Sequence, residues 1–244
     1  MQNKTRAAIF TVQHDEDFNL PMWIKYYSQH FNTEDMYVIS HNCNEELMGG
    51  ILNKASLDGI NVTRITTDEI FNHKWLNELV EGNQRALLDE YEYVIYTDCD
   101  EFIYPTNGTL KEFLENATDQ YYRCTGYSTV GDKMYRTPGF DKTLIVNSPL
   151  KYCAGYHLAN IDVPVSENLH LYHLHRLNYD ESWKRTLRLS HESWDPKAVS
   201  ELLSWENRIN EEVAFSEWFH ADDFLLRPYS PQLVNLLSEV GYIK

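Results

Sequence analysis

Short apolar runs alternate with helical patterns along the first hundred residues of this chain. Four short runs predict strands at residues 6–13, 36–40, 60–65 and 93–97, and the apolar character of the first and the last of them predicts burial. Between them, helical spacing predicts helices over residues 20–31 and 45–57, and Thr67 or Asp68 can cap a third helix that ends near residue 90. This alternation predicts an α/β fold with a mostly parallel central sheet and helices on both of its faces.

The pattern changes after residue 105. Thr109 and Glu112 have the spacing of a capping box, which predicts a short helix. Between residues 120 and 172, short β-rich runs are interrupted by Gly, Pro, Asn and Asp, and this predicts antiparallel or irregular strands that form the far wall of a pocket. Helical spacing returns beyond Asp180 and predicts C-terminal helices at residues 182–192, 197–215 and 231–240.

Three carboxylates follow the last strand of the parallel region. Residues 91–105 read YEYVIYTDCDEFIYP, so Asp98, Asp100 and Glu101 come directly after an apolar run. Ligands of open α/β sheets bind at the carboxyl ends of the strands, and two aspartates one residue apart offer hard oxygen ligands to Mg²⁺ or Mn²⁺. Such a cation can bridge a diphosphate and neutralise its charge as it leaves. Acids in this position also cap helices and form turns, so a structural interpretation stands beside the metal-binding one.

A second group of candidate ligands lies in residues 169–180, LHLYHLHRLNYD. Three histidines fall within six residues, and in an extended chain His173 and His175 point to the same face. One of them would complete a metal site begun by Asp100, and imidazole combined with carboxylate suits Mn²⁺ better than Ca²⁺. The alternative is that these histidines are partly buried hydrogen-bond donors that only support the fold.

Charge narrows the classes of ligand. The chain has 244 residues, of which 21 are basic and 37 acidic, so its formal net charge is −16. This balance argues against nucleic-acid binding and against docking on an anionic membrane, whereas a nucleotide is compatible with it if a metal screens the phosphates. Lys142 and Arg176 are candidates for contacts to phosphate oxygens. Neither the G-x-G-x-x-G fingerprint nor a P-loop is present.

Cysteine usage and hydropathy bear on location. The four cysteines are far apart and lack the spacing of a zinc site, which predicts free thiols in a reducing compartment. No segment has the length of a transmembrane span, and no signal peptide opens the sequence. We therefore expect a cytoplasmic protein with no integral membrane segment.

These features together resemble the glycosyltransferase family 2-like group, whose members have the GT-A fold. The resemblance rests on the helix LPMWIKYYSQHF soon after the first strand, on DCDEF after a later strand, and on the downstream stretches FDKTLIV, GYHLA and LYHLHR. It covers roughly residues 7–180. The chain departs from the family in two respects: Ser40, His41 and Asn42 stand where many members have an acid after strand two, and no Glu-Asp pair matches the usual catalytic base.

The resemblance implies roles for the acids near the amino-terminal strands. Asp98 and Asp100 would be the Asp-x-Asp pair, which binds the ribose of a nucleotide sugar and the metal–diphosphate unit. The loop that contains His14, Glu16 and Asp17 would lie near the nucleotide base and its ribose. The implied fold is a GT-A-like nucleotide-sugar-binding fold with additional C-terminal helices.

The resemblance also implies roles further along the chain. His173 or His175 would be the late histidine that meets the metal or the diphosphate, and Lys142 would face the phosphates or the acceptor. We therefore divide the chain into a catalytic domain at residues 1–180 and a helical extension at residues 181–244. Within the catalytic domain, a nucleotide-sugar half would span about residues 1–105 and an acceptor half about residues 106–180.

The expected activity is transfer of a sugar from a nucleoside-diphosphate sugar to a glycan or another hydroxyl acceptor, with Mn²⁺ or Mg²⁺ and with inversion of the anomeric centre. A general base would take the proton of the acceptor hydroxyl, and the candidates are Asp132, Asp162, Glu101 and His157. Two other classes remain open. One is a metal-dependent phosphohydrolase, since Asp-x-Asp also serves phosphoryl transfer; the other is a non-catalytic module that binds nucleotide sugars or carbohydrate.

Overall fold

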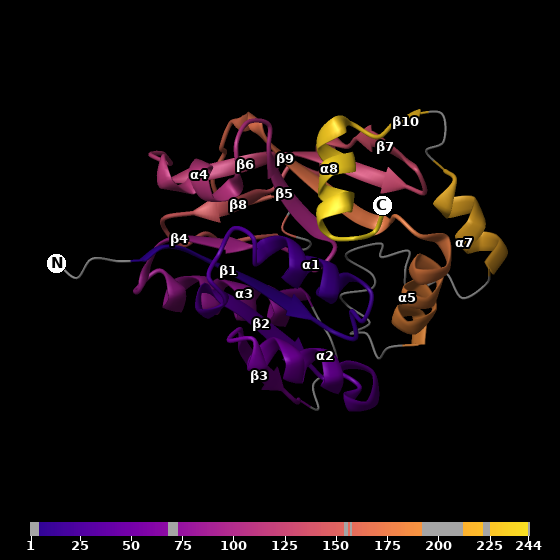
Figure 1. The fold of residues 1–244 in the computed structure, drawn as a ribbon, viewed down its shortest axis with the longest axis horizontal. Helices are drawn as coiled ribbons and strands as arrows, with labels where there is room; N and C mark the ends of the chain where they lie inside the picture. Colours follow the sequence, from indigo (N-terminus) through magenta and orange to yellow (C-terminus); the bar gives the residue numbers. More distant parts are fainter. Residues whose placement is uncertain are drawn as a thin grey trace.

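The N-terminal strands build the parallel part of a ten-stranded mixed sheet in the computed structural model of this chain (Figure 1). β1 (Thr5–Gln13) pairs in parallel with β2 (Met36–His41) and with β4 (Tyr91–Tyr96), and β2 pairs in parallel with β3 (Asn61–Ile65). The structure describes residues 5–67, 73–153, 156, 158–191, 212–221 and 225–243. Because these strands run the same way, the loops that follow β1, β2 and β4 meet at one edge of the sheet.

The sheet continues beyond β4 with antiparallel strands. β8 (Thr143–Val146) pairs with β4 and with β6 (Tyr121–Val130), and β6 pairs with β7 (Lys133–Arg136), which in turn pairs with β10 (Arg227–Pro228). This agrees with the antiparallel strands predicted for residues 120–172.

Two further strands connect the acidic turn to the histidine run. β5 (Glu101–Pro105) pairs antiparallel with β9 (Val165–Arg176), and β9 also lies parallel beside β6. The register sets Glu101 opposite His173. Residues about seventy positions apart in the sequence are thereby held on neighbouring strands.

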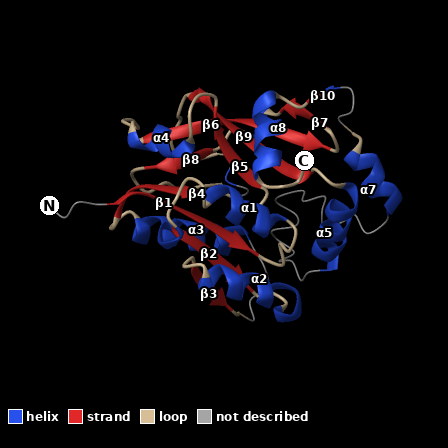
Figure 2. Cartoon of the chain, in the orientation of Figure 1, coloured by secondary structure: helices blue, strands red, loops and turns tan. Residues whose placement is uncertain are grey.

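Helices cover both faces of the sheet (Figures 1 and 2). Ala7 and Ile9 of β1 belong to one apolar cluster, whereas Ala8 and Phe10 belong to another, as the alternation of side chains along a strand requires. The second cluster includes Val80 of α3 (His73–Leu87). The first cluster is covered by α1 (Asn19–Tyr27), α2 (Glu45–Leu57), α4 (Leu110–Glu115) and α8 (Pro231–Glu239).

Two helices near the C-terminus form a smaller cluster with β6 and β7. α5 (Tyr179–His191) follows β9 after two residues, and its aromatic side chains pack with Phe215 and Phe219 of α7 (Glu212–Phe219). Two short 3₁₀ helices, η1 (Thr33–Asp35) and η2 (Pro138–Phe140), complete the described elements. η2 lies against β6 and leads directly into the segment that carries Lys142.

The predicted α/β class, with parallel core strands and helices on both faces, is confirmed. The helix at Glu45–Leu57 forms as predicted although it contains two glycines, because Asn44 caps it by accepting hydrogen bonds from the backbone N–H groups of Glu46 and Leu47. The capping box at Thr109 and Glu112 is also present. The division of the chain near residue 180 stays a prediction.

Several boundaries differ from the sequence-based expectation. α1 ends at Tyr27 rather than near residue 31, and the third helix is described from His73, since residues 68–72 lie outside the described ranges. The predicted strand near residue 152 is only an isolated bridge from Tyr152 to Ala159. Most of the helix predicted at 197–215 falls outside the described residues.

Thiols and hydropathy agree with the sequence. None of the four cysteines, all of which lie in the described ranges, is paired in a disulfide. In the described part of the chain, no helix combines the length and the apolar character needed to cross a bilayer.

Candidate functional site

The acidic turn between β4 and β5 is the centre of the candidate site. The N–H of Glu101 donates to the carbonyl of Asp98 at 3.0 Å and closes the turn. The N–H of Leu174 on β9 donates to the carbonyl of Asp100 at 2.7 Å, so the turn is joined by its backbone to the histidine-bearing strand. The carboxylates therefore lie at the carboxyl end of β4, where ligands of such sheets bind.

Aromatic side chains of α1 fix both ends of this turn. Trp23 Nε1–H donates to Thr97 Oγ1 at 2.8 Å, and the Tyr27 hydroxyl donates to the carbonyl of Glu101 at 3.1 Å. Both aromatic side chains are fully buried. α1, which carries the Leu-Pro-x-Trp sequence, thus holds the acidic turn in place through these two hydrogen bonds.

Asp100 lies between an imidazole and a guanidinium. Its side chain is 2% exposed, and its Oδ2 lies 3.3 Å from His173 Nε2 and 3.8 Å from Arg185 Nη1. Among the described residues, no group donates a hydrogen bond to this oxygen. A buried carboxylate oxygen in that condition is destabilising unless a cation compensates it. Asp100 Oδ2 is therefore well suited to binding a cation.

Asp98 and Glu101 share the ammonium group of Lys142. Lys142 Nζ lies 2.5 Å from Glu101 Oε1 and 3.3 Å from Asp98 Oδ2, and its side chain is 2% exposed. The Tyr96 hydroxyl donates to the other oxygen of Asp98 at 2.6 Å. The three acids thus face different groups: Lys142 compensates Asp98 and Glu101, whereas His173 and Arg185 lie near Asp100.

Burial controls the ionisation of this group. Loss of hydration raises the pKa of Glu101 to about 7, and Asp98 and Asp100 add to this rise while the Lys142 ammonium opposes it. For Lys142, burial lowers the pKa, but attraction by Glu101 and Asp98 outweighs it and leaves the pKa above its usual value. Lys142 therefore stays charged at neutral pH.

His173 and His175 lie on the same face of β9, as the sequence predicted. Their ring centroids are 4.1 Å apart, and the Phe140 ring lies edge-on to His173 with 4.6 Å between centroids. Burial holds the pKa of His175 well below its usual value, and His173 and Arg176 lower it further. His175 is therefore neutral, which is the protonation state that ligates metals.

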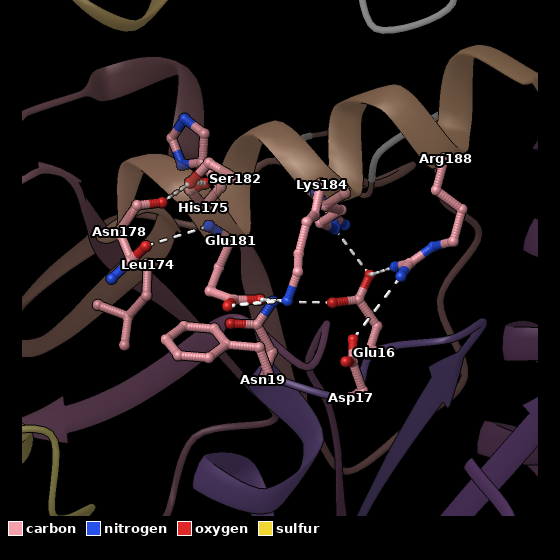
Figure 3. Close-up of a pocket in the computed structure, with 12 residues that line it drawn as sticks. Glu16, Asp17, Asn19, Leu174, His175, Asn178, Glu181, Ser182, Lys184 and Arg188 are labelled. Carbon is pink, nitrogen blue, oxygen red and sulfur yellow. Dashed lines mark hydrogen bonds and ion pairs between the residues drawn. The ribbon is translucent and has the colours of Figure 1, made fainter. Parts of the chain in front are cut away.

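The loop between β1 and α1 reaches the acidic turn through α5. Glu16 Oε1 lies 2.7 Å from Arg185 Nε, the same guanidinium that approaches Asp100. Arg188 lies 3.9 Å from Glu16 and 3.7 Å from Asp17 and points from α5 toward both acids (Figure 3). The β1–α1 loop, the end of β9 and α5 line a pocket that also includes Asn19, Asn178 and Lys184. His14 does not line this pocket, and its Nδ1 is 2.8 Å from the carbonyl oxygen of His41.

The basic side chains of α5 are functional candidates that the sequence analysis missed. Lys184, Arg185 and Arg188 fall within five residues of a chain that is otherwise strongly acidic. They lie 9 to 13 positions after His175 in the sequence. This local concentration of positive charge was the available signal for a phosphate-binding group.

Tyr156 is a second residue that the sequence analysis missed. Its φ of 59° is unusual for a bulky residue, and such backbone strain often occurs at functional sites. The buried ring packs on Tyr96 at 4.6 Å and lies 5.9 Å from Lys142 Nζ. Tyr156 thus covers the two residues that contact Asp98.

The remaining predicted residues lie elsewhere. Arg176 points to the other face of β9, where it donates to the Tyr135 hydroxyl at 2.6 Å and its guanidinium lies over the Trp218 ring at 5.0 Å. The Arg176 guanidinium thus contacts side chains on that face and does not reach the acidic turn. Asp132 is exposed in the turn between β6 and β7, and Asp162 is fully exposed, 3.8 Å from Arg123. His157 lies outside the described residues.

Asp100 and His173 fit a divalent cation of the Mn²⁺ or Mg²⁺ type. Their carboxylate oxygen and imidazole nitrogen converge, and this mixed donor set suits Mn²⁺. Over the described ranges, no group of three or more His, Cys, Asp or Glu side chains is arranged to hold a metal on its own. The other ligands would therefore be substrate phosphates and water, as is usual where Mg²⁺ binds at nucleotide sites.

Comparisons with known proteins give no family assignment. No family model matches the chain, and no curated protein matches it. Among solved structures, S. aureus TarS 1-349 in complex with UDP is 13% identical with a TM-score of 0.45, and the match covers 96% of this chain and 79% of that one. At this identity and TM-score, the likeness assigns no activity.

Two other solved structures show a similar degree of likeness. A putative glucose-1-phosphate thymidylyltransferase from Bacillus anthracis is 11% identical with a TM-score of 0.38, over 98% of this chain and 96% of that one. Glucosyl-3-phosphoglycerate synthase from Mycobacterium tuberculosis, in complex with Mn²⁺, UDP-glucose and phosphoglyceric acid, is 11% identical with a TM-score of 0.34, over 52% of this chain and 44% of that one.

Proposed function

We propose that this chain is a metal-dependent glycosyltransferase that moves a sugar from a nucleoside-diphosphate sugar to an acceptor hydroxyl with inversion. The observation that carries the proposal is the position of Asp100. Its buried Oδ2 faces His173 at 3.3 Å and Arg185 at 3.8 Å, at the carboxyl end of a central parallel strand. The sequence resemblance to family 2-like glycosyltransferases supports the same reaction.

In this proposal, Asp100 and His173 hold Mn²⁺ or Mg²⁺. A metal held by these two residues would supply positive charge beside a departing nucleoside diphosphate. The basic face of α5 supplies further positive charge, since Arg185 and Arg188 already contact acidic groups around the pocket. When a donor binds, we expect these guanidinium groups to exchange carboxylate partners for phosphate oxygens, for which their fork geometry is suited.

Other residues would recognise the nucleoside and the acceptor. His14, Glu16 and Asp17 are proposed to lie along the base and ribose, and Asp98 is proposed to accept from the ribose hydroxyls while Lys142 holds it in place. Glu101 is fully buried against Lys142, so we assign it a supporting charge rather than proton abstraction. Asp132, Asp162 and His157 stay as candidates for the base that takes the acceptor proton.

The test is release of nucleoside diphosphate from a panel of nucleotide sugars, with Mn²⁺, with Mg²⁺ and with EDTA. Slow transfer to water should reveal the donor without knowledge of the acceptor, and we expect release from one donor that EDTA abolishes and added Mn²⁺ restores. Release of inorganic phosphate instead would identify a phosphohydrolase. Metal-dependent binding of a donor without any release, even with acceptors supplied, would identify a non-catalytic module.

Removal of the α5 guanidinium groups should weaken donor binding. Charge-assisted hydrogen bonds contribute about 1.5–3 kcal/mol, so Arg185→Ala should raise the donor Kd about tenfold or more, and Arg188→Ala should raise it by a smaller factor. Isothermal titration with the nucleoside diphosphate measures this directly. Arg64→Ala is the control, because Arg64 on β3 pairs with Glu45 on α2 at an exposed position outside the pocket lining. Equal affinity in all three variants would remove α5 from the donor site.

A further inference from the structure

One short segment supplies side chains to both halves of the candidate site. Phe140, at the end of η2, lies edge-on to His173 with 4.6 Å between centroids and 89° between ring planes. Lys142, two residues later, inserts between Glu101 and Asp98. The position of this segment therefore affects both the imidazole that faces Asp100 and the ammonium that compensates the neighbouring acids.

Asp141, the residue between them, ties the segment to β6 and β7. Its Oδ1 accepts from the N–H of Gly126 at 2.8 Å, and its Oδ2 accepts from Arg136 Nη2 at 2.7 Å. Arg136 Nη1 also donates to the carbonyl of Gly126 at 3.0 Å. The carboxylate is buried, with 7% of its side chain exposed. Asp141 thus uses both oxygens to fix one point on each of two strands.

Gly126 permits this close approach. A Cβ atom built at Gly126 would lie 2.4 Å from the carbonyl carbon and from the oxygen of Phe140, and 2.8 Å from its Cβ. These atoms belong mainly to the backbone and cannot turn aside. Any side chain at this position would therefore push η2, and Phe140 with it, away from β6.

We propose that Asp141, together with Gly126 and Arg136, is a positioning clamp for the site. The clamp sets η2 against β6, which fixes Phe140 against His173 and so orients the imidazole toward Asp100. The same clamp fixes the backbone from which Lys142 reaches Asp98 and Glu101. Replacing a residue that orients a metal ligand without touching the metal typically lowers metal affinity or activity by about 10- to 100-fold. The inference rests on the proposed function for the identity of the ligand but not for the clamp itself.

The test compares Asp141→Asn with Asp35→Asn. An asparagine at 141 keeps the size and one acceptor for Gly126 N–H, but it removes the charge that holds Arg136. Asp35 is a matched control, since it is a buried aspartate that accepts from Tyr91 and Asn32 at 3.0 Å each. It ends η1 just before β2, at the opposite end of the parallel strands from the acidic turn. The readouts are the Kd for Mn²⁺ by electron paramagnetic resonance and the imidazole ¹⁵N resonances of His173 in the apoprotein, assigned with His173→Gln.

We expect Asp141→Asn to raise the Kd for Mn²⁺ about tenfold or more and to shift the His173 resonances, while Asp35→Asn changes the Kd less than twofold and leaves those resonances in place. Arg136→Gln, which removes the guanidinium that holds Asp141, should shift the same resonances even if Asp141→Asn folds poorly. Unchanged His173 resonances in both Asp141→Asn and Arg136→Gln would overturn the clamp. Shifted resonances in a protein that binds no Mn²⁺ and cleaves no donor would support the clamp and reject the proposed function.

Discussion

Replacing Asp100 by asparagine is expected to lower metal-dependent cleavage of the donor by about three orders of magnitude. The change keeps the size of the side chain but removes the negative charge from the oxygen that faces His173. A bound metal stabilises a leaving group by several kcal/mol, and each 1.4 kcal/mol corresponds to about tenfold in rate. Single-turnover release of nucleoside diphosphate at saturating Mn²⁺, together with the Kd for Mn²⁺, measures both parts of the effect.

The controls separate this loss from a loss of folding. Asp58→Asn changes an exposed aspartate that pairs with Lys54 on α2, and it should leave cleavage within twofold of wild type. Asp100→Asn should melt at the wild-type temperature, because two effects offset each other. The substitution loses the contacts with His173 and Arg185, but it also removes the cost of burying a charge. If Asp100→Asn kept more than a tenth of wild-type activity, the metal-binding role of Asp100 would be refuted.

The sequence predicts the parallel core because its signals there are local. β1, β2 and β4 are mainly apolar runs between helical segments, whereas β3 is more polar and largely exposed. α2 has a cap that the structure confirms. The strand alternation rule also places His173 and His175 on one face, as observed. Applied one residue further, the same rule places Arg176 on the opposite face, where it packs with Tyr135 and Trp218. The prediction of Arg176 as a phosphate contact overlooked this consequence of the pattern.

The parts that the sequence could not predict depend on contacts between distant residues. β5 is five residues long and starts within the acidic turn, so its strand conformation depends on pairing with β9. Arg185 meets Glu16 across 169 positions of sequence. Asp141 and Gly126 acquire their importance only when η2 packs on β6. Local propensity carries no information on such pairings. The charge run on α5 is visible in the sequence, but its partners Glu16 and Asp17 are not.

Replacing Lys142 by methionine is expected to destabilise the protein by about 3–5 kcal/mol, the usual cost of removing one partner from a buried ion pair. Methionine preserves most of the volume and leaves Glu101 and Asp98 without the ammonium that lies 2.5 Å and 3.3 Å from them. Urea unfolding at pH 8 measures the change in the free energy of unfolding. The double variant with Glu101→Gln should recover at least half of the loss, because it also removes the buried charge that was left uncompensated. A single-variant loss below about 1 kcal/mol, typical of exposed ion pairs, would show that Lys142 is not the counter-charge of the acidic turn.

The loss in Lys142→Met should also depend on pH in a definite direction. Burial already raises the pKa of Glu101 to about 7 while Lys142 opposes the rise, so removal of the ammonium raises this pKa further. The folded protein then binds more protons than the unfolded chain above the unfolded pKa of about 4.3, and its stability increases as pH falls. Between pH 8 and pH 5.5, the difference in the free energy of unfolding between Lys142→Met and wild type should narrow by about 1 kcal/mol or more.

The double variant with Glu101→Gln is the control, because it lacks the titrating carboxyl group. Its advantage in the free energy of unfolding over Lys142→Met should therefore shrink between pH 8 and pH 5.5. A gap that stayed constant with pH would mean that Glu101 does not take up the proton, and the destabilisation would then have to come from Asp98 or from packing around position 142.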